Sequence, residues 1–136
     1  MNAVAVDTSV LLAIFKGEPK GELWLGCLQS AAEAASLLVS SVVYAEIRSF
    51  FPSDEACRAA LQDLDLRHSA LNEDAANLAG RIFRDYRNEG GPWTTILPDF
   101  LVAAHAATQA DSLATDDRGY LRAYFPNLRI LSPTIR

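Results

Sequence analysis

Several residue types that mark particular classes of protein are scarce in this chain. It has two cysteines, Cys27 and Cys57, without a CxxC spacing, and two histidines without an HxxxH pair. A metal site built on cysteine or histidine is therefore not expected, whereas two free thiols in a reducing cytoplasm are. No apolar run approaches the roughly 20 residues that span a bilayer, and no secretory signal is recognisable, so we expect a cytoplasmic protein without membrane contact.

Positive charge is also in short supply. The net charge is −5, and only two of the twelve basic residues are lysines. This balance argues against a protein that coats nucleic acid through a broad basic surface. It still allows a nuclease, because an acidic metal site lowers the total charge while a few arginines contact phosphates.

The order of apolar segments predicts an α/β fold in a single domain over residues 1–136. Strands and helices alternate, which indicates a three-layer arrangement with a central, mostly parallel sheet of four to five strands between helices. We expect strands over 3–6, 37–40, 112–115 and 128–131, with an ambiguous edge strand over 65–70. We expect helices over 22–35, 54–63, 99–106 and 120–124. Another helix ends at 15, one begins after an N-cap at Ser41, and one runs from an N-cap at Asn72 to 88.

Glu46 is the most informative of the charged residues. Helical spacing places it on one face with Val42, Val43, Ile47 and Phe50, which should be buried. A carboxylate on such a face is costly unless a positive group meets it, and no lysine or arginine shares the face. The pattern therefore predicts that Glu46 points towards a bound cation.

Three further acids fall where this fold would bring them to the same edge of the sheet. Asp7 follows the first strand, Asp117 follows the third, and Asp99 stands in the first turn of a helix. Converging carboxylates suit a hard ion, Mg²⁺ or Mn²⁺, which can activate water and hold a phosphodiester. We expect Asp7, Glu46, Asp99 and Asp117 to bind the metal and to be the catalytic residues.

Each acid also has an ordinary structural explanation. Asp7 could cap a helix, Asp99 could interact with a helix dipole, Asp117 could be a turn residue, and an arginine could pair with Glu46. The prediction of a metal site therefore depends on the joint placement of the four residues.

The segments that carry these acids resemble the PIN-domain nucleases, and among them the VapC-type toxins of bacterial toxin–antitoxin pairs. The matching segments are 6–9 (VDTS), 41–46 (SVVYAE), 98–106 (PDFLVAAHA), 113–120 (LATDDRGY) and 124–130 (YFPNLRI). Each segment is short, but their order and spacing make the set specific, and together they cover essentially the whole chain.

This resemblance implies a Mg²⁺- or Mn²⁺-dependent endoribonuclease, a homodimer inhibited by a small antitoxin, and structured RNA such as transfer RNA as the target. It assigns the acidic metal-site roles to the same four acids. Thr8 or Ser9 would orient the site, and Thr115 would support it through its hydroxyl. The last acidic motif places its acid at Asp117. Asp116 would then be an outer helper or a turn residue.

Arginines near the last acid are candidate phosphate contacts. Arg118 follows Asp117 directly and Arg122 lies one turn later, although a solvated helix face explains both equally well.

Other functions remain alternatives. A phosphoacceptor domain would need a second acid beside Asp7 and a lysine after the last strand, but all the lysines lie in the first loop. An aspartyl phosphatase would need an Asp-x-Asp pair at the first strand, and Asp7-Thr8-Ser9 lacks the second acid. A non-catalytic interaction module with the same fold, and a housekeeping PIN nuclease without an antitoxin, stay open.

Overall fold

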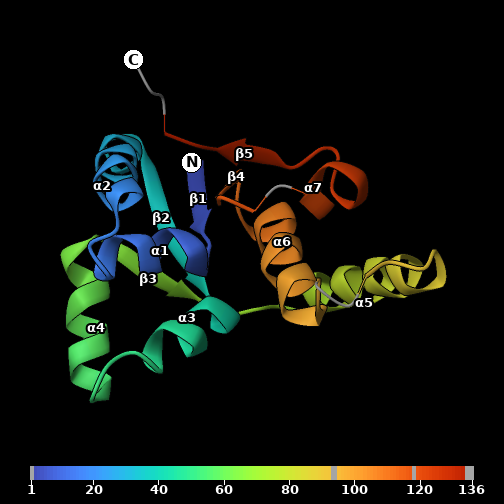
Figure 1. The fold of residues 1–136 in the computed structure, drawn as a ribbon, viewed down its shortest axis with the longest axis horizontal. Helices are drawn as coiled ribbons and strands as arrows, with labels where there is room; N and C mark the ends of the chain where they lie inside the picture. Colours follow the sequence, from blue (N-terminus) through green and yellow to red (C-terminus); the bar gives the residue numbers. More distant parts are fainter. Residues whose placement is uncertain (1, 93–94, 118, 134–136) are drawn as a thin grey trace.

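The computed structural model describes residues 2–92, 95–117 and 119–133, in which strands and helices alternate as expected (Figure 1). The strands are β1 (Asn2–Val6), β2 (Ala35–Ser40), β3 (Leu66–Ser69), β4 (Ser112–Ala114) and β5 (Arg129–Leu131). The helices are α1 (Thr8–Phe15), α2 (Pro19–Ala32), α3 (Ser41–Arg48), α4 (Asp54–Asp63), α5 (Glu73–Asn88), α6 (Leu97–Gln109) and α7 (Gly119–Tyr124).

The strands form a five-stranded sheet in the order β3-β2-β1-β4-β5, and every pairing is parallel. This confirms the expected parallel α/β sheet, including the edge position of β3. Strand β1 lies at the centre, and its residues Val4, Ala5 and Val6 are buried. The chain leaves β1 at Asp7, whose backbone N–H donates to the carbonyl of Ala114 at 2.9 Å. The carboxyl ends of β1 and β4 therefore meet.

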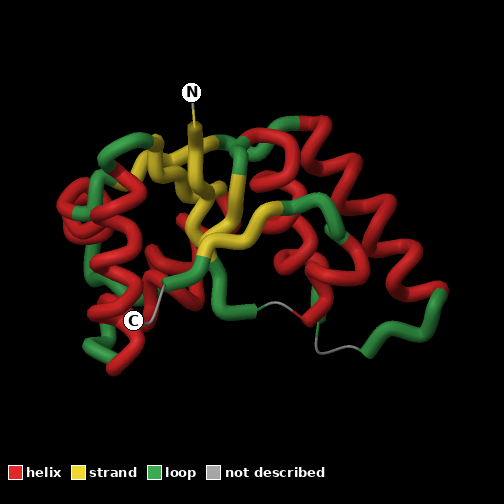
Figure 2. The backbone as a smooth tube through the Cα atoms, turned by 90° about the horizontal axis from the view of Figure 1, so that it is seen from above, coloured by secondary structure: helices red, strands yellow, loops and turns green. Residues whose placement is uncertain are grey.

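Helices cover both sides of the sheet, which gives the expected three layers. Helices α1 and α2 pack together on one side, and α5 and α6 pack together on the other (Figures 1 and 2). Because both faces are covered, the ends of the strands are the natural place for a ligand.

A cluster of aromatic rings fixes the position of α6. Phe100 is fully buried, and the ring centroids of Phe83, Tyr86 and Tyr120 lie 5.2, 5.1 and 5.3 Å from its own. Full burial of such a ring contributes about 1.5–3 kcal/mol, and each favourable ring pair about 0.5–1.5 kcal/mol more. The cluster joins α5, α6 and α7 immediately beside Asp99, the residue before Phe100.

The ends of several helices differ from the expectation, as in α6, which runs over Leu97–Gln109 and not over 99–106. Helix α2 begins at Pro19, three residues early, because proline suits the first helical position. The N-cap of α3 is Ser40, whose hydroxyl accepts from the Val43 N–H at 3.3 Å, so Ser41 is the first helical residue. Asn72 caps α5 as expected.

The scarce residue types behave as expected where the structure describes them. Cys27 and Cys57 are both free thiols. Of the helices in the described ranges, none combines the length and the apolar composition needed to cross a bilayer.

Two glycines of α2 test how closely α1 and α2 pack. A Cβ at Gly21 would overlap the carbonyl oxygen of Ala13, whereas a Cβ at Gly26 would meet open space. We expect Gly21→Ala to lower the free energy of unfolding by about 1–3 kcal/mol through overpacking. Gly26→Ala, the matched control, should raise it by about 0.5–1 kcal/mol. Urea unfolding measures both, and a Gly21→Ala protein as stable as the wild type would contradict the packing described.

Candidate metal-binding site

Asp7 is held at the carboxyl end of β1 by two hydroxyl groups. It occupies the N-cap position of α1, but its side chain makes no capping hydrogen bond. Instead its Oδ2 accepts from Ser9 Oγ at 2.9 Å and from Thr115 Oγ1 at 2.8 Å. Both bonds reach the same oxygen, so they orient the carboxylate without adding positive charge.

Thr115 connects two of the acids. It lies just after β4, is 1% exposed, and its Oγ1 accepts from the Asp117 N–H at 3.0 Å while donating to Asp7. A single buried hydroxyl thus links the turn that carries Asp117 to the end of β1. Asp117 itself is exposed to solvent.

Asp99 stands in the first turn of α6, where its Oδ2 accepts from the Ile96 N–H at 2.9 Å. Burial raises the pKa of Asp99, and the negative charges of Asp117 and Asp7 raise it further, against the opposing effect of the Ile96 hydrogen bond. The negative charges of Asp7 and Asp117, which come from distant stretches of the chain, thus contribute to the environment of Asp99.

Glu46 differs from the expectation. It is exposed, and so is Phe50, at 54%. The buried residues of α3 are Val43 and Ile47. This eight-residue helix packs against the rest of the fold along that one row, so Val42 is half-buried and Glu46 is exposed. The expectation of a buried, unpaired Glu46 was therefore wrong.

Glu46 nevertheless reaches the residue next to Asp7. Its Oε1 accepts from Thr8 Oγ1 at 2.8 Å. Thr8 is the first residue of α1, so this bond places the carboxylate of α3 beside the end of β1. Thr8 and Ser9 thus contact different acids: Thr8 donates to Glu46, and Ser9 donates to Asp7.

Asp116 faces away from Asp117, towards α2. Its Oδ2 accepts from Trp24 Nε1 at 3.1 Å, and its Oδ1 lies 3.9 Å from Lys20 Nζ. Its backbone N–H donates to Ser9 Oγ at 3.4 Å. These contacts fasten the turn after β4 to α2.

Two contacts of the site were not anticipated from the sequence. The indole N–H of the buried Trp24 donates to Asp116; a buried tryptophan needs a partner for its N–H, and that need was the available indication. The Tyr120 hydroxyl donates to the Asp99 carbonyl at 3.0 Å. Burial raises the pKa of Tyr120 far above its usual range, with further contributions from Asp7, Asp99 and Asp117, so the hydroxyl stays a donor.

Of the two candidate phosphate contacts, only Arg122 lies within the described residues. Arg122 is exposed on α7 and has no hydrogen bond or ion pair with any described residue. Arg118 lies outside the described residues.

The donor set fits a hard divalent cation in its chemistry. All four acids offer carboxylate oxygens, and in the described ranges the ion pairs involve other residues, Lys20–Asp116 and Arg48–Asp54. Burial raises the pKa of Asp99, and the negative charges of Asp117 and Asp7 add to that rise. No group of three or more acidic, histidine or cysteine side chains in the described part of the chain is already drawn together around a common ion position.

Comparison with known proteins adds a family and a fold. The family model of the PIN domain matches residues 4–126. Among solved structures, VapBC2 from Rickettsia felis bound to a DNA fragment from its promoter gives a TM-score of 0.73 at 22% identity, covering 95% of this chain and 97% of that one. DNA-bound VapBC from Salmonella typhimurium gives 0.73 at 19%, covering 96% and 98%. A toxin–antitoxin complex from Klebsiella pneumoniae gives 0.67 at 18%, with the same coverage.

At these identities the solved structures share the fold with this chain. No curated protein matches it.

The raised pKa of Asp99 leads to a prediction about the free energy of unfolding in the absence of metal. Because burial and neighbouring acids raise its folded-state pKa, ionised Asp99 destabilises the folded chain at neutral pH, and this cost vanishes below the ordinary carboxyl pKa. In chelator, Asp99→Asn should raise the free energy of unfolding at pH 7 by up to about 1 kcal/mol, since the group is partly solvated. The gain should be lost near pH 3. Urea unfolding at both pH values measures it.

The control is Asp63→Asn, at the exposed end of α4. A lower stability of the Asp99→Asn protein at pH 7, or a gain that grows on acidification, would contradict the charge repulsion.

Proposed function

Because the chain belongs to the PIN-domain family, whose members are in general nucleases, we propose that it is an endoribonuclease dependent on Mg²⁺ or Mn²⁺. The observation that carries this proposal is the buried Thr115 hydroxyl, which joins Asp7 to the turn of Asp117 at the carboxyl edge of a parallel sheet. Convergent carboxylates without a basic partner in the described ranges suit a divalent cation better than they suit a purely structural role.

Asp7, Asp99 and Asp117 would hold the metal, and Glu46 would bind it directly or through water. When bound, a divalent ion lowers the pKa of water and stabilises negative charge on a phosphodiester. The other residues act on the acids. Thr115 and Ser9 keep Asp7 Oδ2 oriented, and Thr8 holds Glu46 at the same edge.

Tyr120 has a positioning role in this proposal. Its neutral phenol donates to the Asp99 carbonyl, and its ring packs against Phe100. It therefore links α7, which follows Asp117, to the first turn of α6 without adding another charge to the site.

We also propose that the protein is the toxin of a toxin–antitoxin pair, with a small antitoxin as partner, a homodimeric state and structured RNA such as transfer RNA as substrate. The support is the sequence resemblance to VapC-type toxins and the shared fold with VapBC structures. A folded protein that cleaves no RNA with either metal would favour the non-catalytic interaction module. RNA cleavage by the protein, if it has no antitoxin partner, would favour a housekeeping nuclease.

Substitution of the acids tests the catalytic proposal. Asp7→Asn, Asp99→Asn and Asp117→Asn should each lower metal-dependent RNA cleavage about a hundredfold or more, because loss of one carboxylate weakens the hold on the metal. Asp116→Asn should cost less than Asp117→Asn, because Asp116 contacts α2. Cleavage of a labelled RNA with and without chelator measures the effect.

The exposed Asp63→Asn is the control and should retain activity. Full activity of the Asp7→Asn and Asp99→Asn proteins would refute the assignment of the site. A larger loss from Asp116→Asn than from Asp117→Asn would reassign the last ligand.

A further inference from the structure

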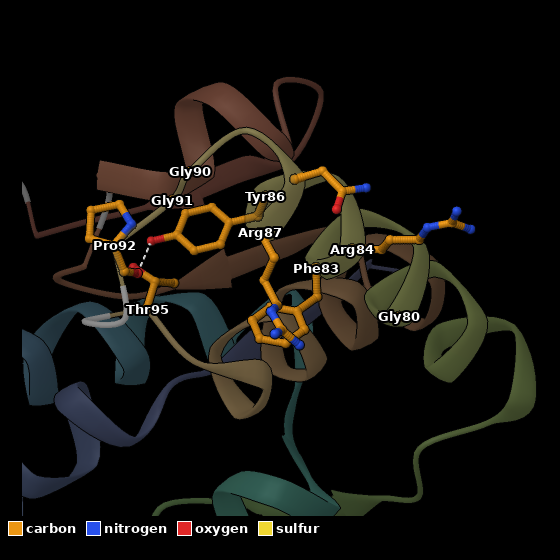
Figure 3. A pocket seen from close by; sticks show the side chains of 10 residues that line it. Gly80, Phe83, Arg84, Tyr86, Arg87, Gly90, Gly91, Pro92 and Thr95 are labelled. Atoms are coloured by element: carbon orange, nitrogen blue, oxygen red, sulfur yellow. Dashed lines mark hydrogen bonds between the residues drawn. The ribbon is translucent and has the colours of Figure 1, made fainter.

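A separate cavity lies beside the first turn of α6. It has a volume of about 570 Å³ and is lined by residues of α5 and by residues 90–92 and 95 (Figure 3). Its lining includes Phe83, Arg84, Tyr86, Arg87 and Thr95. This volume is within the range of sites that hold a small organic molecule or a nucleotide.

The walls of the cavity combine an aromatic surface with fixed backbone. The guanidinium of Arg87 lies over the Phe83 ring, 5.9 Å from its centroid. The Tyr86 hydroxyl donates to the carbonyl of Pro92, and a Cβ at Gly91 would overlap the Tyr86 ring. The glycine therefore permits a close approach of the turn to the ring, which holds this side of the cavity in place (Figure 3).

The lining is positively charged, in contrast to the chain as a whole. It contains Arg84 and Arg87, and no acid occurs among its described residues, although the net charge of the chain is −5. Asp85 and Glu89 stand on the same helix but do not line the cavity, and Glu89 accepts from the Tyr124 hydroxyl at 2.7 Å. A local positive potential of this kind favours an anion.

The cavity and the acidic site share one piece of structure. Thr95 lines the cavity, and the next residue, Ile96, donates its N–H to Asp99. On the other side, the rings of Phe83 and Tyr86 pack 5.2 and 5.1 Å from that of Phe100, which follows Asp99. The residues on both sides of Asp99 thus connect the acidic site to the walls of the cavity.

We propose that this cavity binds one nucleotide of the RNA substrate that flanks the cleaved phosphodiester. Arg84 contacts its phosphate, and its base stacks on the surface formed by Phe83 and Arg87. The proposal rests on the proposed nuclease function, and it names a binding position that the acids themselves do not supply. An acidic protein segment would also match the charge, but it would not need the face of an aromatic ring.

The test is binding of a short, fluorescently labelled, single-stranded oligoribonucleotide to the full chain in chelator, where no cleavage occurs. We expect Arg84→Ala to raise the Kd about fivefold and to lessen its dependence on salt, because one phosphate contact is lost. Phe83→Leu, which keeps an apolar side chain in place but removes the ring, should raise the Kd at least about fivefold. Arg81→Ala is the matched control, since Arg81 is exposed on the same helix but does not line the cavity.

Three results would overturn this inference. The first is an unchanged Kd in both Arg84→Ala and Phe83→Leu. The second is an equal increase in Arg81→Ala, which would indicate diffuse attraction. The third is an acidic peptide that displaces the RNA from the wild type and binds equally well to Phe83→Leu.

Cleavage assays separate this inference from the proposed function. Metal-dependent cleavage with KM unaffected by Arg84→Ala would refute the cavity and leave the nuclease intact. Binding that depends on Arg84 and Phe83, in a protein that cleaves with neither metal, would support the cavity and refute the catalytic proposal.

Discussion

Asp7, Asp99 and Asp117 bring like charges into one neighbourhood, and the described residues around them supply neutral donors in place of cations. Two carboxylates about 4 Å apart repel by roughly 4 kcal/mol at an effective dielectric constant near 20. The raised pKa of Asp99 records this repulsion together with burial. The fold must hold the acids against it, and a divalent cation is the ligand that would relieve it.

The holding contacts come from every layer of the fold. Thr115 and Ser9 orient Asp7, the Ile96 N–H donates to the Asp99 carboxylate, and Tyr120 donates to the Asp99 backbone. The aromatic cluster around Phe100 fixes the start of α6. None of these groups carries charge, so they position the acids without neutralising them. The same start of α6 borders the basic, aromatic cavity, which places an anion-binding surface next to an acidic centre.

Features set by local sequence were predictable, and features set by distant contacts were not. Alternating strands and helices, the Asn72 cap and the acids after β1 and β4 follow from short patterns. The predicted burial of Glu46 was wrong because a short helix can bury fewer residues than its apolar pattern suggests; α3 buries Val43 and Ile47. The Trp24–Asp116 contact joins residues 92 positions apart, so no local pattern contains it.

The most direct measurement of the central claim is the thermal unfolding midpoint with added Mn²⁺ or Mg²⁺. A ligand that binds only the folded chain stabilises it by about 2.7 kcal/mol at a hundred times its Kd. The midpoint of the wild type should rise with either metal, and the rise should be abolished in a variant that lacks two of the acids, Asp7→Asn with Asp99→Asn. An equal rise in both proteins, or no rise in the wild type, would contradict a metal site formed by these carboxylates.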